Sequence, residues 1–196
     1  MTEANSRAAE QPINPVFLER WSPRAMTGEP ISREELLTLF EAARWAPSAY
    51  NAQPWRFIYA LRDTPAWETF LNILIPFNQG WAKNAAALVV IVSDSEMLPP
   101  GSDKPVPSHS HSFDAGAAWA SLALQAVHSG LAVHGMTGID FARAAADLGV
   151  PASWRVEAAV AIGKQADKSV LPEGLAAREA PSGRKPLAEI VSEGRF

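Results

Sequence analysis

Apolar residues recur at helical spacing along several segments of the chain, and each of these segments predicts an α-helix. The clearest stripe consists of Leu36, Leu37, Leu39, Phe40 and Ala43. Apolar side chains three and four positions apart share one face of a helix. Ser32 and Glu35 precede the stripe as a capping box, in which two side chains satisfy N–H groups of the first turn. Further helices are predicted over residues 14–21, 64–74, 111–129 and 139–149.

Four segments have the composition of β-strands. Residues 55–61 are short and rich in aromatic and β-branched side chains, which favour strands. Residues 87–94 form an uninterrupted apolar run, which is typical of strands buried on both faces of a sheet. Residues 131–138 and 154–163 are the other two candidates. Because helices and strands alternate without a strict βαβ rhythm, we predict an α+β fold.

The helix expected over residues 111–129 is apolar on nearly all sides. Between Ala115 and Val127 its only polar side chains are Ser121 and Gln125. A helix of this kind is buried nearly all round. It is therefore either central in the domain or packed against a second subunit.

The two ends of the chain differ in composition from the middle. Residues 1–13 are polar and predict a flexible tail, which leaves residues 14–196 as a single domain. Residues 163–196 contain prolines and glycines and few apolar runs, so we expect an extended arm that lies on another part of the protein. Residues 95–109 are rich in proline and predict a loop.

Composition narrows the classes of protein to which the chain can belong. Its 196 residues, 47% of them hydrophobic and 19% charged, fit one globular domain. A net charge of −4 disfavours nucleic acid as a partner. The absence of cysteine excludes disulfides and thiolate metal sites and fits a reducing cytoplasm. The most apolar run, residues 85–92, is too short to span a membrane, so we expect a soluble cytoplasmic protein.

Several common catalytic motifs are missing from the chain. The sequence contains no Walker A motif, no G-x-G-x-x-G fingerprint and no G-x-S-x-G elbow, which disfavours nucleoside triphosphates, an ordinary Rossmann site and a serine hydrolase. His109 and His111 have a spacing that could chelate a metal ion on an extended segment. No carboxylate stands at ligand spacing beside them, so we predict no metal site.

Two basic segments are candidates for binding a phosphate group. Arg20, Ser22 and Arg24 lie in "RWSPR", and Pro23 favours an extended backbone in which alternate side chains share one face. Two guanidinium groups and a hydroxyl on one face suit a terminal phosphate. The alternative is a solvated basic turn. Arg184 and Lys185 form a second, weaker candidate in the C-terminal arm.

The segment "WAPSAYNAQPWRF", residues 45–57, is unusually rich in functional groups for a connection between a helix and a strand. Pro47 ends the helix, and Trp55 is expected in the core. In one interpretation Asn51 and Gln53 satisfy backbone groups of a packed corner; in the other, the amide, hydroxyl and aromatic groups of the segment orient a flat polar heterocycle. The roles of Tyr50 and Gln53 stay open between packing and contact.

The chain resembles the FMN-dependent nitroreductase family from about residue 15 to residue 196. The resemblance rests on five segments in the family's order: "RWSPR", "AARWAPSAYNAQPWRF", "NQGWAKNAAALVVIV", "GLAVHGMTGID" and "APSGRKPLAEIVSEGRF". The A-P-S-x-x-N-x-Q-P-W block is the most specific of them. The resemblance implies a mixed β-sheet flanked by helices and an intertwined homodimer, whose C-terminal arm, residues 163–196, embraces the partner subunit.

The resemblance also implies a cofactor site at the subunit interface. FMN would be held by the positions of this sequence that match the family's motifs: Arg20, Ser22, Arg24, Pro47, Ser48, Asn51, Asn78, Thr137, Gly138, Arg184 and Lys185. Arg20, Ser22, Arg24 and Arg184 correspond to residues on the phosphate, ribityl chain and ring edge. Pro47, Ser48 and Asn51 would reach the FMN bound mainly by the partner. Asn78 would lie at the ring edge, and the backbone of Thr137 and Gly138 near N5.

The activity that the resemblance implies is a ping-pong oxidoreductase reaction. NADH or NADPH would reduce the flavin, which then reduces a flat acceptor such as a nitroaromatic or a quinone, and no catalytic side chain is required. Two alternatives stay open: an FMN-binding protein without turnover, and a specialised flavin enzyme such as a dehalogenase or a flavin-consuming enzyme. The sequence departs from the family at Trp21, where many members have a second basic residue, and in the loop 95–109.

Overall fold

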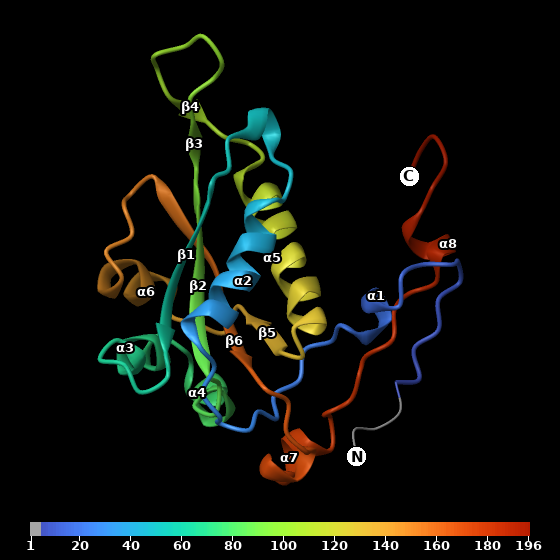
Figure 1. Ribbon diagram of the computed structural model, residues 1–196. Coiled ribbons are helices and arrows are strands. Elements are labelled where there is room, and N and C mark those ends of the chain that lie inside the picture. The colour runs from blue at the N-terminus through green and yellow to red at the C-terminus, as the bar shows by residue number, and fades with distance from the viewer. Residues whose placement is uncertain (1–4) are drawn as a thin grey trace.

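The computed structural model describes residues 5–196 as one layered α+β body from which both ends of the chain extend on the same side (Figure 1). The strands are β1 (Trp55–Leu61), β2 (Ala87–Asp94), β3 (Glu96–Met97), β4 (Val106–Pro107), β5 (Ala132–Met136) and β6 (Trp154–Gly163). The helices are α1 (Val16–Glu19), α2 (Arg33–Arg44), η1 (Ala49–Asn51), α3 (Trp67–Asn72), α4 (Pro76–Ala82), α5 (His111–His128), α6 (Phe141–Asp147), η2 (Lys168–Val170), α7 (Glu173–Ala176) and α8 (Leu187–Ile190).

The central sheet has the strand order β1-β2-β6-β5 within residues 5–196, and all its described pairs are antiparallel. The mixed sheet implied by the family resemblance is therefore wrong for the described residues. A parallel pair requires a crossover that returns the chain to the same end of the sheet. Here the chain passes through α3 and α4 and enters β2 at the end where β1 finishes, so that Leu61 pairs with Ala87.

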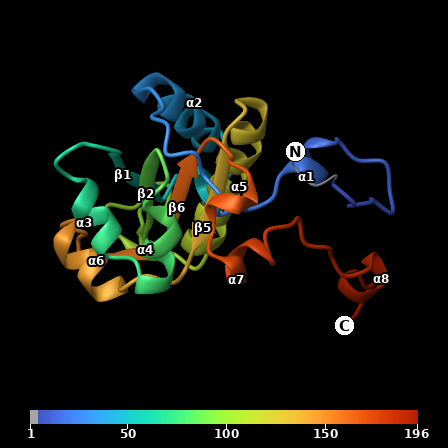
Figure 2. The same ribbon diagram turned by 90° about the horizontal axis from the view of Figure 1, so that it is seen from below.

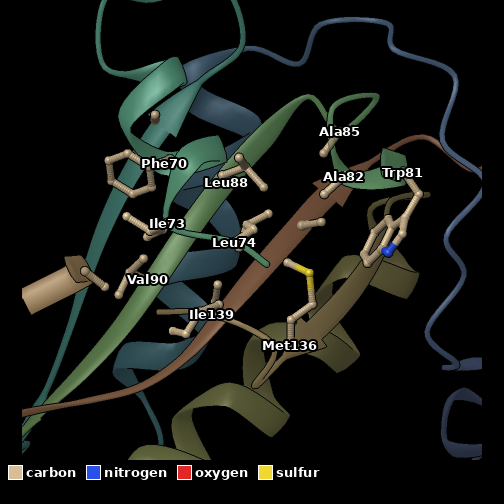
Figure 3. Close-up of a cluster of buried hydrophobic side chains, with 14 of the residues drawn as sticks. Phe70, Ile73, Leu74, Trp81, Ala82, Ala85, Leu88, Val90, Met136 and Ile139 are labelled. Atoms are coloured by element: carbon tan, nitrogen blue, oxygen red, sulfur yellow. The ribbon is translucent and has the colours of Figure 1, made fainter. Parts of the chain in front are cut away.

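Each face of the sheet carries its own hydrophobic core, because side chains alternate between the faces along every strand. Leu88 and Val90 of β2 contribute to the core beneath α3, α4 and α6, which also contains Trp81, Met136 and Ile139 (Figure 3). The neighbouring residues of β2 contribute to the core beneath α2 and α5. Burial of β2 on both faces explains why its sequence shows no polar alternation, and it confirms the prediction for residues 87–94.

The helices α2 and α5 cover one face of the sheet, while α3, α4 and α6 cover the other (Figure 2). The capping box of α2 is confirmed, because Ser32 Oγ accepts the N–H of Glu35 and the Glu35 carboxylate accepts the N–H of Ser32. The helix predicted over residues 139–149 is also confirmed and is capped by Asp140. The seven-residue helix α4 was not predicted, because Gly80 and the small number of turns weaken its periodicity.

Some predicted elements begin or end differently. The helix predicted over residues 14–21 is the single turn α1. Before this turn, the side-chain oxygen Oδ1 of Asn14 accepts the N–H of Val16. The helix predicted over residues 64–74 is confined to α3, because residues 64–66 form a turn. The loop predicted over residues 95–109 contains the two-residue ladder of β3 and β4. The flexible tail predicted over residues 1–13 falls partly on residues 1–4, which lie outside the described residues, and its mobility stays a prediction.

Candidate functional site

A groove of about 600 Å³ runs along α5 where this helix crosses β5 and β6. Its wall is mostly apolar, and its polar lining consists of Arg20, Ser22, Ser112, Thr137 and Glu157. The apolar lining comes from Phe17, Ile91, Ala115, Trp119, Ala120, Ala123, Leu124, Met136, Ala158 and Val160. An apolar groove of this volume with a few polar groups is typical of a site for a small organic ligand.

The segment "RWSPR" reaches the groove through two of its three candidate side chains. Arg20 and Ser22 line the groove, and Arg20 Nη1 donates a hydrogen bond of 3.3 Å to Ser22 Oγ. Arg24 instead packs against the C-terminal arm, where one of its guanidinium nitrogens lies 3.8 Å from Glu179 Oε2. Arg20 and Ser22 therefore lie together at the groove and Arg24 does not line it, and the binding of a phosphate by these side chains stays a prediction.

Glu179 is a buried carboxylate that sequence reasoning did not identify. Its Oε1 accepts the backbone N–H groups of Arg24 and Ala25 at 2.5 and 2.7 Å. Its Oε2 and the Nε of Arg24 are both buried without a hydrogen-bond partner in the described structure. Glu179 thus fixes the backbone of the "RWSPR" segment from the C-terminal arm. A single acidic residue in a tail with irregular composition gives no sequence signal for such a contact.

Arg20 and Arg184, which are far apart in the sequence, lie within electrostatic reach of each other. Burial lowers the pKa of the Arg20 guanidinium, and the positive charge of Arg184 lowers this pKa further. Arg184 and Lys185 are exposed and line a second hollow. This hollow lies between the C-terminal arm and the N-terminal segment, residues 5–20, and it shares Phe17 with the groove. Arg7 also lies within electrostatic reach of Arg184 and Arg20, although no motif in the sequence singles it out.

Asn78, Thr137 and Gly138 come together where β5 leads into α6. The amide nitrogen of Asn78 donates to the Gly138 carbonyl at 3.0 Å, and its Oδ1 accepts the indole N–H of Trp81 at 3.3 Å. A Cβ atom on Gly138 would lie 2.5 Å from Asn78 Nδ2 and 2.9 Å from Ile75 Cδ1. A side chain at position 138 would therefore displace the ends of the Asn78 and Ile75 side chains, whereas glycine lets them approach closely.

The loop that contains Pro47, Ser48 and Asn51 lies at the N-terminal end of α5. The buried carboxylate of Asp114 accepts the N–H of Ala49, which fixes this loop to α5. None of the three predicted residues lines the groove of its own chain. Pro47 and Asn51 are exposed, as is Tyr50, whereas Trp55 is buried as predicted.

The same loop holds three residues in the left-handed region of backbone conformation. Tyr50, Asn51 and Gln53 have φ values of 52°, 55° and 50°. Such backbone costs on the order of 1–3 kcal/mol per residue and persists where the surrounding structure enforces it, often at ligand sites. Two hydrogen bonds enforce it here: Ser48 Oγ accepts the N–H of Gln53, and the Gln53 side chain donates to the Asn51 carbonyl.

Glu157 is placed in the groove by an irregularity of the sheet. The register between β2 and β6 shifts at Ile91 and Val92, so that Glu157 is the extra residue of a β-bulge. Bulges redirect side chains and are common beside active sites. Glu157 Oε1 accepts the hydroxyl groups of Ser93 and Ser112, both at 2.6 Å. The buried Ser93 hydroxyl also lies 2.7 Å from His111 Nδ1, which gives this histidine a structural partner.

His134 lies behind the "RWSPR" segment, on β5. Its Nδ1 lies 3.1 Å from the Pro23 carbonyl, so this nitrogen carries the hydrogen, and its ring packs against Trp81 at 4.7 Å between centroids. Burial lowers the pKa of His134, and the positive charge of Arg24 acts in the same direction. The neutral imidazole is thus the form that the folded protein favours.

The lowered pKa of His134 predicts a loss of stability in mild acid. The unfolded chain takes up a proton on this histidine near pH 6.5, while the folded protein resists doing so until a lower pH. The contribution is therefore complete above about pH 6.5 and is lost as the pH falls. We expect His134→Gln to lose less stability than the wild type between pH 7.5 and 5.5, as measured by urea unfolding. Equal losses would contradict this origin.

Residues 5–196 lack both a metal-binding cluster and a membrane-spanning helix. No group of three or more histidine, aspartate or glutamate side chains there is arranged to bind a metal ion. None of the helices in this part of the chain combines the length and apolar character needed to cross a membrane.

Comparison with known proteins gives the same fold. A solved oxidoreductase containing FMN is 51% identical, with a TM-score of 0.94 over 100% of this chain and 98% of the other. The FMN complex of a protein from Desulfovibrio desulfuricans is 28% identical, with a TM-score of 0.70 over 94% of this chain and 99% of the other. The NADH dehydrogenase of Thermus thermophilus is 30% identical over 201 aligned positions, which cover 89% of this chain and 92% of the relative.

The family assignment follows from the extent of these similarities. The model of the Nitroreductase family matches residues 18–75 and 66–164, which include every residue that lines the groove except Phe17, the whole "RWSPR" segment and the Asn78–Gly138 contact. These matched ranges cover well over half of the chain. The chain therefore belongs to the Nitroreductase family.

Proposed function

We propose that this protein is an FMN-dependent oxidoreductase that uses NADH or NADPH to reduce a flat acceptor, such as a nitroaromatic or a quinone, by ping-pong hydride transfer. The observation that carries this proposal is the groove along α5, which combines an apolar wall with the polar side chains of Arg20 and Ser22. Arg184 lies within electrostatic reach of Arg20. Relatives described as containing FMN or as NADH dehydrogenase support the cofactor and the donor.

The residues of the groove fit FMN in both charge and shape. A phosphate monoester carries a charge of about −1.5 to −2 near neutral pH and forms strong hydrogen bonds with guanidinium groups. Neither Arg20 nor Arg184 forms an ion pair with an acidic residue among residues 5–196, so their charge is available to a ligand. The apolar wall formed by Trp119, Met136 and Val160 suits a flat aromatic ring.

The protein's own residues would bind and orient the cofactor, while bound FMN supplies the redox chemistry. Arg20, Ser22, Arg184 and Lys185 would hold the phosphate and the ribityl chain. Asn78 would support the edge of the ring through its contact with Gly138, whereas Arg24 packs against Glu179 and would reach the ring only by leaving that contact. The backbone at Thr137 and Gly138 would approach the reactive part of the ring, and Asn78 keeps that backbone in place by its hydrogen bond to Gly138.

The proposal includes a homodimer with the cofactor at its interface. Phe113 of α5 is 81% exposed in the isolated chain, and Phe17 beside the groove is 53% exposed. Large apolar side chains exposed along one side of a domain mark an interaction surface. A second copy would cover them, residues 163–196 would embrace that copy, and its Pro47, Ser48 and Asn51 would complete the site.

Anaerobic titration of the purified protein tests the proposed activity. NADH and NADPH are added in turn to the FMN-loaded protein, and a panel of nitroaromatics and quinones follows, with the flavin absorbance as the readout. We expect one donor to bleach the flavin and an acceptor to restore its colour. Flavin that stays oxidised would favour the alternative of an FMN-binding protein without turnover. Bleaching that no member of the panel reverses would favour the specialised flavin enzyme.

Removing the guanidinium of either Arg20 or Arg184 should weaken FMN binding. We expect Arg20→Ala and Arg184→Ala each to raise the Kd for FMN about tenfold, because each loses a charge-assisted hydrogen bond to the phosphate. Fluorescence titration of FMN measures the change. Arg33→Ala, which removes an exposed arginine at the start of α2, is the matched control. An unchanged Kd in both variants would refute the assignment.

A further inference from the structure

We infer that Arg7, in the N-terminal segment, is a positioning residue for the phosphate end of the site, and this inference rests on the function proposed above. Arg7 Nη1 donates to the backbone carbonyls of Leu18 and Arg20, at 3.1 and 2.7 Å. Its Nε donates to the carbonyl of Ser182 at 2.8 Å. One half-buried guanidinium thus joins the segment that bears Arg20 to the arm that bears Arg184.

The two segments that Arg7 joins are the two halves of the proposed phosphate site. Both the N-terminal segment and the C-terminal arm extend from the same side of the body (Figures 1 and 2). Neither belongs to the central sheet. Their relative position therefore depends on contacts between them. A second contact, from the Leu187 N–H to the Glu10 carboxylate, holds the arm at α8.

The N-terminal segment is itself fixed at the position where Arg7 acts. Asn5 Nδ2 donates to the Leu18 carbonyl at 2.7 Å, and Asn5 Oδ1 accepts the N–H of Arg7 at 3.2 Å. Arg7 therefore reaches its three carbonyl partners from a backbone that is hydrogen-bonded beside α1. This arrangement explains how a residue in a polar segment can define the position of Arg20.

The charges around Arg7 indicate an anion rather than a purely structural contact. Burial lowers the pKa of Arg7, and the positive charges of Arg184 and Arg20 lower it further. Arg7, Arg20 and Arg184 form no ion pair with an acidic residue within the part of the chain that the structure describes. Three neighbouring cations repel one another, and a bound dianion such as a phosphate monoester relieves this repulsion.

Arginine is needed at this position because of the geometry of its donors. The guanidinium presents its N–H groups in a rigid planar fork, which allows one side chain to serve three carbonyl groups on two segments. A lysine carries the same charge on a single nitrogen and cannot reproduce this fork. The charge and the geometry of Arg7 can therefore be separated by substitution.

Comparison of FMN with riboflavin tests the inference, because riboflavin has the same ring and lacks the phosphate. Binding of both ligands is measured by flavin fluorescence for the wild type, Arg7→Ala, Arg7→Lys and the control Arg33→Ala. We expect both Arg7 variants to raise the Kd for FMN by about fivefold to tenfold. Without the fork of Arg7, Arg20 and Arg184 are no longer held in place for charge-assisted contacts with the phosphate. The Kd for riboflavin should change less than about twofold, because no phosphate contact is involved.

Each other outcome identifies which proposal fails. An unchanged Kd for FMN in Arg7→Ala would overturn the role of Arg7. Equal weakening of FMN and riboflavin would also overturn it, because the effect would then be a general loss of structure. Full recovery in Arg7→Lys would show that charge alone matters and would refute the positioning role. A wild type that binds neither ligand would overturn the proposed function itself.

Discussion

Replacing Trp81 by alanine is expected to lower the free energy of unfolding by about 3–5 kcal/mol, the usual range for removing a large aromatic side chain from a core. Trp81 is 1% exposed and lies in the core between the sheet and α4, beside Met136 and His134 (Figure 3). Its indole N–H also donates to Asn78 Oδ1. The substitution should therefore leave a cavity and release Asn78. Urea unfolding at one fixed protein concentration measures the loss.

Two further variants separate the causes of this effect. Trp81→Phe keeps most of the buried volume and removes the indole N–H, so its cost reports mainly on the hydrogen bond to Asn78. Trp45→Ala removes a tryptophan that is 75% exposed, and we expect it to cost under about 1 kcal/mol because little buried area is lost. A cost for Trp81→Ala as small as that of Trp45→Ala would contradict the structure.

Replacing Gly138 by alanine is expected to destabilise the protein by about 1–3 kcal/mol, as overpacking of a filled site generally does. The new Cβ would overlap Asn78 Nδ2 and Ile75 Cδ1. Asn78 cannot move away freely, because it is 8% exposed and its two side-chain hydrogen bonds, to Gly138 and from Trp81, fix its amide. We therefore also expect weaker FMN binding. Urea unfolding and fluorescence titration measure the two effects.

Gly80→Ala is the matched control for this substitution. Gly80 lies within α4, two residues after Asn78, and a Cβ atom there would meet no other atom within 4 Å. Alanine favours helix over glycine by up to about 1 kcal/mol, so Gly80→Ala should be neutral or stabilising. If Gly138→Ala were equally well tolerated, the close packing at position 138 would not be a constraint on the site.

Much of the fold could be predicted because its signals are local. The capping box of α2, the strand β1 and the buried strand β2 follow from residues that are neighbours in the sequence. The short helix α4 and the ladder of β3 and β4 were missed, because elements of one or two turns or two residues carry too little periodicity. The pair β1–β2 is antiparallel because α3 and α4 return the chain to the end of the sheet where β1 finishes, and no local pattern encodes this direction.

The candidate site was predicted in part. Arg20, Ser22 and Thr137 were selected from sequence motifs and line the groove, and Asn78 contacts Gly138, the residue that follows Thr137. Glu179, Glu157 and Arg7 were not selected, because each acts through a partner that is distant in the sequence. Their chemistry depends on contacts with Arg24, Ser93 and Ser182, respectively, which form only in the folded chain.

By itself, the sequence determines the elements, the hydrophobic pattern of each face and the family motifs, because periodicity, capping and composition act over short distances. Only the tertiary structure decides which charges meet. It places Glu179 beneath Arg24, turns Glu157 into the groove by a bulge, and brings Arg7 to the carbonyls of Arg20 and Ser182. Hydrogen bonds and Coulomb interactions depend on distance in space, and residues 175 positions apart in the chain become neighbours only after folding.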